Sequence, residues 1–399
     1  MTKPRDHVAD LRGASRLALD ATTGVVDVVE AMHHTIASGP EVLGRPLAAP
    51  AGIVTRIVYG AIRGVTQLVG TGLEVALASL APLLGAGAPG PEREALVAAL
   101  NGVVGDHLHA TGNPLAIPMR LRHGGAPLAL EREALRAAFP QAGGKILVLV
   151  HGSCMNDRQW CRNGHDHGAA LARDGAYTPV YVHYNTGLHI STNGRELAAL
   201  LERLVAAWPA PVDELAILGH SMGGLVARSA CHTAEAEAHA WRGALRRLVF
   251  LGSPHHGAPW ERGGNLIDLL LGISRYSAPL GRLGRLRSAG VTDMRYGNVL
   301  DEHWRARDRF APGADPRREV KLPAGVACYA VAGTTAREPR SRLPGDGVVP
   351  LDSALGRHAR PELALGFPET HQLVGFGVGH FDLLDRAEVY EALRRWLAP

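Results

Sequence analysis

A serine between glycines is the residue of this sequence best placed for nucleophilic chemistry. Ser221 is the centre of Gly219-His-Ser-Met-Gly223, which follows an apolar run at 215–218 and leads into a helix-compatible stretch. A Gly-x-Ser-x-Gly segment between a strand and a helix is typical of a nucleophile elbow, which holds the serine hydroxyl clear of the backbone. Glycine is needed at 219 and 223 because side chains would collide across so tight a turn. We therefore predict that Ser221 is a nucleophile.

Acyl transfer by a serine also needs a base and an acid that orients the base. Behind a nucleophile elbow these partners follow in the order Ser, Asp or Glu, His. Asp346 lies between two glycines in a predicted turn, and His380 lies in the Gly-rich loop at 375–380, before the last predicted helix. The late position of His380 selects it from twenty histidines. An ordinary Asp-Gly turn is the alternative interpretation of Asp346, and Asp352 is the neighbouring carboxylate to compare with it.

Two backbone N–H groups should stabilise the oxyanion, one from the residue after the nucleophile and one from a loop after an earlier strand. Met222 supplies the first. Ser153 is predicted to supply the second, with Cys154 as the alternative, because Gly152 lets the backbone approach closely after a buried strand. The residues predicted to contact substrate are Cys154, His220, Leu266 and Leu270.

Apolar strands alternating with helices must position these residues, which predicts an α/β fold with a mostly parallel sheet covered by helices on both faces. The predicted strands are 117–123, 145–150, 178–183, 215–218, 247–251 and 325–331, and the predicted helices are 131–139, 194–208, 222–236 and 388–397. Between 259 and 323 the alternation lapses. We interpret this stretch as a cap or lid insertion, with a helix at 265–273 that carries Leu266 and Leu270.

Residues 1–110 are predicted to form a helical N-terminal extension, and residues 111–399 a catalytic domain. The stretch 53–84 is apolar but carries Arg56, Arg63 and Glu74, which favours amphipathic helices over a membrane span. Peripheral contact of these helices with a membrane or lipid droplet is the alternative.

Charge and cysteine content limit the other function classes. The net charge is only +4 and the basic residues are dispersed, whereas a nucleic-acid-binding domain needs a basic stripe with interleaved aromatics. Four cysteines do not make a disulfide scaffold in a chain of 399 residues, although Cys154 and Cys161 are close enough in sequence to pair within a loop. No apolar segment of a secretory signal follows the first residues, so a cytoplasmic location is expected.

Five segments together resemble the α/β-hydrolase superfamily, and within it bacterial lipases and esterases related to the GPI inositol-deacylase-like group. They are Val150-His-Gly152, Gly219-His-Ser-Met-Gly-Gly224, Leu251-Gly-Ser-Pro-His-His-Gly257, Gly345-Asp-Gly347 and Gly379-His-Phe-Asp382. Tyr184-Asn-Thr-Gly187, followed by a helix, strengthens the likeness, which covers about residues 115–399. The resemblance implies hydrolysis of carboxylic esters through an acyl-enzyme, without an organic cofactor.

Metal sites are expected only weakly. The resemblance to bacterial lipases that hold a structural calcium two residues after the catalytic histidine places that ligand on Asp382, but a second aspartate cannot be assigned. We predict that His165-Asp-His167 caps a helix or faces solvent rather than binding a metal.

The sequence therefore predicts a serine ester hydrolase that acts on a small-molecule or lipid ester. An acyltransferase or a depolymerase of polyhydroxyalkanoate could use the same three residues. A non-enzymatic protein of a lipid or granule surface, working through its N-terminal helices, is the alternative from another class. Such a protein would not need a serine, an aspartate and a histidine in this order, and their presence weakens this alternative.

Overall fold

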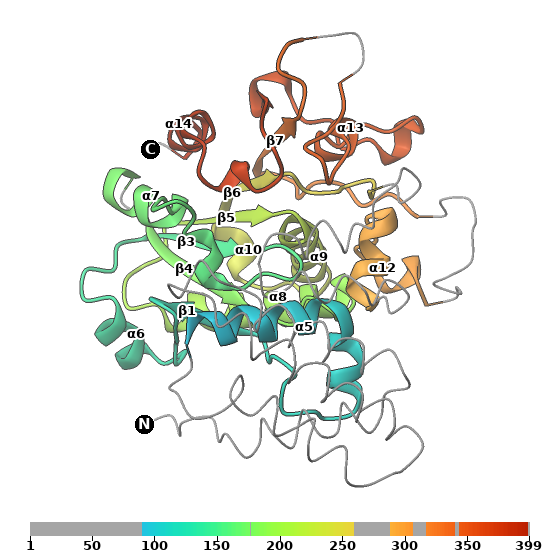
Figure 1. Cartoon of the computed structure of the whole chain (residues 1–399). Helices are drawn as coiled ribbons and strands as arrows, with labels where there is room; N and C mark the ends of the chain where they lie inside the picture. The colour runs from blue at the N-terminus through green and yellow to red at the C-terminus, as the bar shows by residue number, and fades with distance from the viewer. Residues whose placement is uncertain (1–89, 176, 259–287, 306–316, 340–342, 398–399) are drawn as a thin grey trace, which may run out of the picture. The chain divides into compact units, whose positions relative to one another are not determined.

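A computed structural model of the chain describes residues 90–175, 177–258, 288–305, 317–339 and 343–397 (Figure 1). The described residues belong to two compact units, one with residues 90–117 and Ser288, the other with the remainder from residue 118 onward. Residues 1–89 of the predicted extension and the predicted helix at 265–273, with Leu266 and Leu270, lie outside the described residues.

An eight-stranded sheet, in the order β2-β1-β4-β3-β5-β6-β7-β8, forms the centre of the larger unit. The strands are β1 (Arg120–His123), β2 (Ala126–Pro127), β3 (Lys145–Val150), β4 (Thr178–His183), β5 (Glu214–His220), β6 (Leu245–Leu251), β7 (Ala327–Thr334) and β8 (Gln372–Phe376). The strands from β4 to β8 pair in parallel, and β1 is antiparallel to both of its neighbours. This is the topology of the α/β-hydrolase fold, as the sequence predicts.

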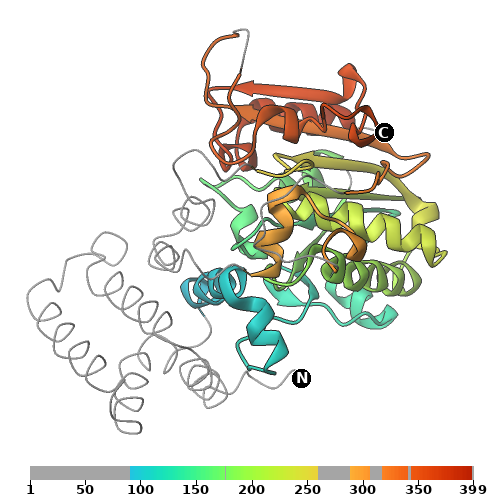
Figure 2. The same ribbon diagram turned by 90° about the vertical axis from the view of Figure 1, so that its right-hand side faces the viewer.

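Helices cover both faces of this sheet (Figures 1 and 2). The helices of the larger unit are α6 (Arg132–Ala138), α7 (His167–Gly175), α8 (Ile190–Ala207), α9 (Met222–Ala236), α10 (Trp241–Ala244), α12 (Ala289–Tyr296), α13 (Leu351–Ala354) and α14 (Ala387–Trp396). Alternate residues of β3, β5, β6 and β7 form one buried core with residues of α7 and α14, because successive side chains of a strand point to opposite faces. Helices α8 and α9 pack against each other, and α9 follows β5 directly, so the elbow lies at the carboxyl end of the central strand.

Most predicted elements are confirmed within a few residues, and β3, β4 and α9 have the predicted bounds. Helix α8 begins at Ile190, four residues before the predicted start, because a distant residue caps it. Asp293 Oδ2 accepts the Ile190 N–H at 3.0 Å and contacts His189 Nδ1 at 2.9 Å. A carboxylate at this position satisfies a helix N–H that has no partner within the helix.

The predicted role of His165-Asp-His167 at a helix start is confirmed. Asp166 Oδ1 accepts the Ala169 N–H at 2.9 Å at the start of α7, which is the bonding of an N-cap residue. The two histidines contact each other, with 2.8 Å between His165 Nε2 and His167 Nδ1, and His167 Nε2 lies 3.0 Å from Leu383 O. Because the carbonyl can only accept, His167 donates from Nε2.

The smaller unit contains helix α5 (Pro91–Ala110), the described part of the predicted N-terminal extension. The buried Asn101 amide holds the following segment to this helix, since it donates to Leu115 O and accepts the Ile117 N–H, both at 2.9 Å. Ser288 Oγ donates to Gly102 O at 2.6 Å. The buried side chains of Asn101 and Ser288 thus have hydrogen-bond partners within this unit.

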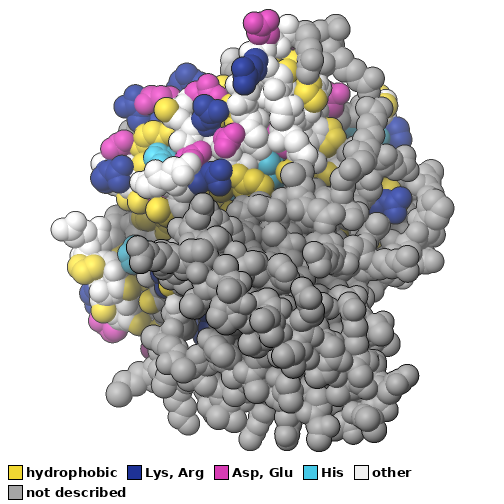
Figure 3. Space-filling model, in the orientation of Figure 1, with side chains coloured by type: hydrophobic (Ala, Val, Ile, Leu, Met, Phe, Trp, Pro, Cys, Tyr) yellow, Lys and Arg dark blue, Asp and Glu magenta, His cyan; other side chains and the backbone are white. Residues whose placement is uncertain are grey.

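The surface is mixed in charge where the structure describes it. Figure 3 shows acidic and basic side chains interspersed with hydrophobic ones on the face in view, as expected from the dispersed basic residues. Within the described ranges, no helix combines the length and apolar character required to span a membrane.

Candidate active site

Ser221 lies in a strained turn between β5 and α9. Its φ and ψ are 52° and −123°, a conformation that costs a non-glycine residue about 1–3 kcal/mol and concentrates at functional sites. A Cβ at Gly219 would lie 2.6 Å from Gly224 Cα, and one at Gly223 would lie 2.1 Å from Val150 O. Both positions therefore exclude a side chain, as the sequence predicts for an elbow.

Backbone hydrogen bonds of the sheet continue beyond the carboxyl ends of β5 and β6. The Ser221 N–H donates to Leu251 O at 2.8 Å, and the Gly252 N–H donates to Val331 O at 2.8 Å. These bonds join the ends of β5, β6 and β7 directly. The elbow is therefore held in register with the neighbouring strands, and Ser221 has a defined place relative to the loops that follow them.

Asp346 and His380 form a buried pair. His380 Nδ1 lies 2.7 Å from Asp346 Oδ2, and the two residues are 2% and 3% exposed. Asp346 Oδ1 accepts the N–H groups of Val348 and Val349, at 2.9 and 2.7 Å. A carboxylate can only accept, so His380 carries its proton on Nδ1 and presents the lone pair of Nε2. That tautomer is the one a general base requires.

His380 is brought next to the elbow through His220. The two rings are 4.8 Å apart, and His220 Nε2 donates to His380 O at 3.2 Å. Burial, followed by electrostatic repulsion between the two rings, lowers the pKa of His220 well below its ordinary value. No hydrogen bond joins Ser221 Oγ to the buried His380 Nε2 among the described residues, as is common before substrate binds. His220, predicted to contact substrate, is itself fully buried, and its polar contact is with His380.

Gly252 at the end of β6 lies directly under the Asp346–His380 pair. Its φ is +57°, and a Cβ there would approach Leu383 Cδ1 to 2.8 Å and both Asp346 Oδ2 and His380 Nδ1 to 3.1 Å. Glycine adopts positive φ at little steric cost. In the sequence, Gly252 is singled out only as a member of the segment 251–257 that carries the family resemblance. Its neighbours in the sequence do not indicate its contact with Asp346 and His380.

Ser153 and Met222, the two predicted oxyanion donors, each follow a residue that lies close to its counterpart, since a Cβ at Gly152 would lie 3.0 Å from Ser221 Cβ. Met222 is the first residue of α9, where N–H groups have no acceptor within the helix. The Ser153 N–H has no hydrogen-bond partner among the described residues. The Cys154 N–H, the alternative predicted donor, instead donates to Thr186 Oγ1 at 3.1 Å. Ser153 and Met222 therefore retain the free donors that an oxyanion needs.

The Cys154 thiol is a poor nucleophile. Burial raises its pKa to about 12, and the thiolate is the reactive form of cysteine. All four cysteines are free, with Cys154 buried and Cys161 exposed. The disulfide considered between these two is therefore not formed in the structure.

Asp382, where the resemblance would place a calcium ligand, has protein partners for both of its carboxylate oxygens. Asp382 Oδ2 accepts the Gly379 N–H at 2.9 Å, and Arg162 Nη2 lies 3.7 Å from Asp382 Oδ1. A guanidinium this close competes with a metal ion for the carboxylate. In the described ranges, no group of three or more His, Cys, Asp or Glu residues could hold a metal. The structure assigns Asp382 to the loop that carries His380.

Four buried histidines predict loss of stability in acid. Burial lowers the pKa of His151 to about 3 and of His167 to about 4, and those of His220 and His255 well below 6.5. The unfolded chain protonates these rings near pH 6.5, so below that pH the unfolded state binds more protons. The free energy of unfolding should fall by up to about 1.4 kcal/mol per pH unit for each histidine, down to its folded-state pKa. Urea titrations at pH 7, 6 and 5 would measure it, and unchanged stability across this range would contradict the expectation.

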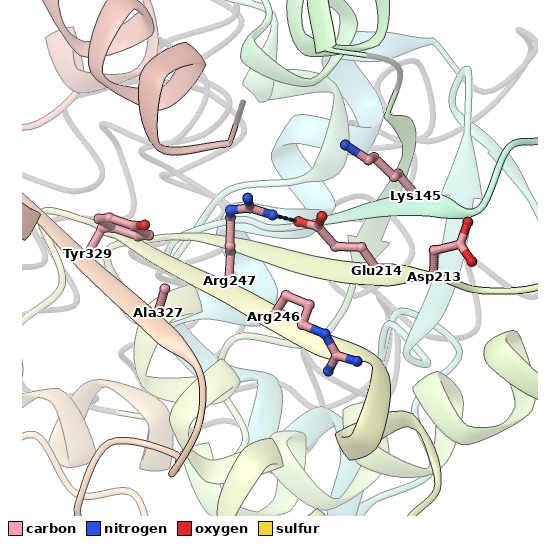
Figure 4. A pocket seen from close by; sticks show the side chains of 7 residues that line it. All are labelled: Lys145, Asp213, Glu214, Arg246, Arg247, Ala327 and Tyr329. Carbon is pink, nitrogen blue, oxygen red and sulfur yellow. Dashed lines mark hydrogen bonds and ion pairs between the residues drawn. The ribbon is translucent and has the colours of Figure 1, made fainter. Parts of the chain in front are cut away.

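A depression lies at the amino ends of the parallel strands β3, β5, β6 and β7, and Figure 4 shows the side chains that line it. Its volume is about 440 Å³, and its lining is Lys145, Asp213, Glu214, Arg246, Arg247, Ala327 and Tyr329. Glu214 accepts from Tyr177 Oη and from Arg247, and burial, followed by the bond to Glu214, raises the pKa of Tyr177. Since β5 starts at Glu214 and ends at His220, this network lies a full strand length from Ser221. We interpret it as a stabilising ion network.

Comparisons with known proteins give one family and a set of distant structures. Residues 126–292, less than half of the chain, match the family described as Domain of unknown function (DUF7379). This stretch includes Ser153 and Ser221 and ends before Asp346. The search of curated proteins gave no match.

The similar solved structures include lipases and esterases. Aspergillus fumigatus lipase B is 13% identical with a TM-score of 0.38, over 66% of this chain and 57% of the lipase. EstA from Clostridium botulinum is 13% identical with a TM-score of 0.39, over 64% and 87%. The Pyrobaculum calidifontis esterase is 13% identical with a TM-score of 0.37, over 77% and 88%. By the order and direction of its own strands, the chain has the α/β-hydrolase fold.

Proposed function

We propose that this protein is a serine hydrolase of carboxylic esters. The observation that carries the proposal is that the strained Ser221 elbow and the buried Asp346–His380 pair lie at the same carboxyl ends of the parallel strands. A serine is an ordinary residue until a base activates it and an acid orients the base. Backbone strain by itself also occurs at ligand clamps and switch regions, but strain beside an oriented histidine supports nucleophilic catalysis.

The proposed reaction has two steps. Ser221 Oγ attacks the ester carbonyl while His380 Nε2 takes its proton, and His380 returns that proton to the leaving alcohol as the C–O bond breaks. A water molecule then attacks the acyl-enzyme, again losing its proton to His380, and the acid is released with Ser221 restored. The N–H groups of Ser153 and Met222 stabilise the oxyanion of both tetrahedral intermediates, and each N–H should raise the rate by about 10²- to 10³-fold.

The substrate is proposed to be a small-molecule or lipid ester. An acyltransferase or a polyester depolymerase would use the same groups, so the acceptor and product decide between them. Membrane or lipid-droplet contact through residues 1–110 remains a prediction, because most of that stretch lies outside the described residues. A cytoplasmic location also remains a prediction.

Hydrolysis of p-nitrophenyl esters with acyl chains of two to about sixteen carbons tests the function. We expect activity with at least part of the series, with a burst of nitrophenol equal to the enzyme added if deacylation is slower than acylation. A phosphonate inhibitor should add at Ser221, as located by mass spectrometry of the digested protein. A full-length protein that is inert toward every ester and unlabelled at Ser221 would refute the proposal. Added glycerol or another alcohol would reveal acyl transfer by its ester product.

A further inference from the structure

The loop that carries Ser153 is held from outside by the segment after β4. Tyr184 Oη donates to His151 O at 2.8 Å, and the two rings stack with centroids 4.4 Å apart. The Cys154 N–H donates to Thr186 Oγ1 at 3.1 Å. Thr186 is 1% exposed, so solvent does not compete for this bond. The loop is thus anchored on both sides of Ser153.

The elbow holds the same loop from inside. A Cβ at Gly152 would lie 3.0 Å from both His220 Nδ1 and Ser221 Cβ, so the backbone at Gly152 is in direct contact with the nucleophile's turn. Cys154 has φ +60°, which non-glycine residues adopt only when their surroundings compensate the cost. The hydrogen bond from its N–H to Thr186 provides such compensation. The Gly152–Ser153 peptide, whose N–H is the predicted donor, lies between these two contacts.

Thr186 is itself held in place by its neighbours. The Gly290 N–H donates to Gly187 O at 3.1 Å, and a Cβ at Gly290 would lie 2.1 Å from Thr186 O. Asn185 Oδ1 accepts the Gly187 N–H at 2.9 Å. The backbone around Thr186 is therefore tightly packed between α12 and the loop, and its hydroxyl has a defined position.

We propose that Thr186 is a positioning residue, whose hydroxyl aims the Ser153 N–H at the substrate oxyanion by holding the neighbouring Cys154 N–H. The proposal rests on the proposed ester hydrolysis. Loss of the hydroxyl leaves a buried N–H without an acceptor, and that peptide can recover a partner only by rotating the loop. Because the oxyanion forms after substrate binds, a misaligned donor should destabilise the transition state more than the enzyme–substrate complex.

Thr186→Val removes the acceptor at nearly constant volume, and it tests the proposal on the full-length protein. We expect kcat to fall by about 10- to 100-fold, less than for a lost oxyanion donor, with KM changed by less than about threefold. Binding of an alkylboronic acid, which forms a tetrahedral adduct on the serine, should weaken by the same factor as kcat/KM. Thr186→Ser keeps the hydroxyl and should retain kcat within about threefold.

Thr292→Val is the matched control. Thr292 is also buried, and its hydroxyl donates to Ala289 O at 2.7 Å. This bond lies within α12 and does not involve Cys154, so Thr292→Val should lower the Tm without changing kcat. If Thr186→Val does not fold, Thr186→Ala removes the same acceptor without adding a methyl group. An unchanged kcat in a folded Thr186→Val or Thr186→Ala, or an equal loss in Thr186→Ser, would overturn the proposal. A wild type inert toward all esters would instead refute the proposed function itself.

Discussion

Replacing Ser221 by alanine is expected to lower kcat by about 10⁵- to 10⁶-fold, because no other described group at this position can form the acyl-enzyme. The oxyanion donors and the binding contacts stay in place, so a small residual rate over water should remain. The measurement is release of p-nitrophenol by the wild type and the variant, with circular dichroism and Tm to confirm the fold. An alanine variant that keeps more than about one hundredth of the activity would contradict the assignment of Ser221.

Ser221→Gly is the matched companion of the alanine variant. The backbone at φ 52° and ψ −123° is strained for serine and alanine but accessible to glycine. We therefore expect the glycine variant to be as inactive as the alanine variant and to have the higher Tm of the two. A higher Tm for the alanine variant would contradict the expectation that glycine relieves backbone strain at position 221.

Replacing Asp346 by asparagine is expected to lower kcat by about 10⁴-fold. Two backbone N–H groups, of Val348 and Val349, donate to Asp346 Oδ1. In asparagine the carbonyl oxygen must keep that place, which turns the amide NH₂ toward His380 Nδ1. The ring then has to accept at Nδ1 and carry its proton on Nε2, the tautomer that cannot act as a base toward Ser221.

Asp352→Asn is the control for this prediction. Asp352 is six residues from Asp346, its side chain is 75% exposed, and it contacts Arg357 at 3.5 Å. Exposed ion pairs contribute little to stability, so this variant should keep wild-type kcat and nearly the wild-type Tm. The result that would sink the assignment is the reverse pattern, with activity lost in Asp352→Asn and kept within tenfold in Asp346→Asn.

Local sequence patterns were sufficient for the centre of the fold. The run of apolar residues up to Val150 predicts a buried strand at 145–150, and β3 has these bounds. The elbow was also readable, because its strand, glycines and helix lie within one short segment. Chain order predicts Asp346 and His380, and in the structure His380 Nδ1 lies 2.7 Å from Asp346 Oδ2. Their catalytic roles remain predictions until the variants are measured.

Features set by distant residues could not be read in this way. The sequence does not predict strand β8, because its first three residues are only half-buried and its last is exposed, which weakens the apolar signal. The start of α8 depends on Asp293, about a hundred residues downstream. The contact of Thr186 with Cys154 joins two loops whose pairing follows from the sheet order and not from either sequence. A pattern within one segment carries no information about such partners.

The bonds that continue the ladder past β5 and β6 also bear on how the protein acquires its activity. Ser221, Asp346 and His380 come from segments separated by long stretches of chain, and they meet only after β5, β6, β7 and β8 have paired in parallel. Pairing of distant strands loses a large loop-closure entropy before the stabilising contacts form, and it is therefore intrinsically slow. Helices form on a far shorter timescale. During refolding, esterase activity should therefore return after the helical signal, as a reporter of the last strands to join the sheet.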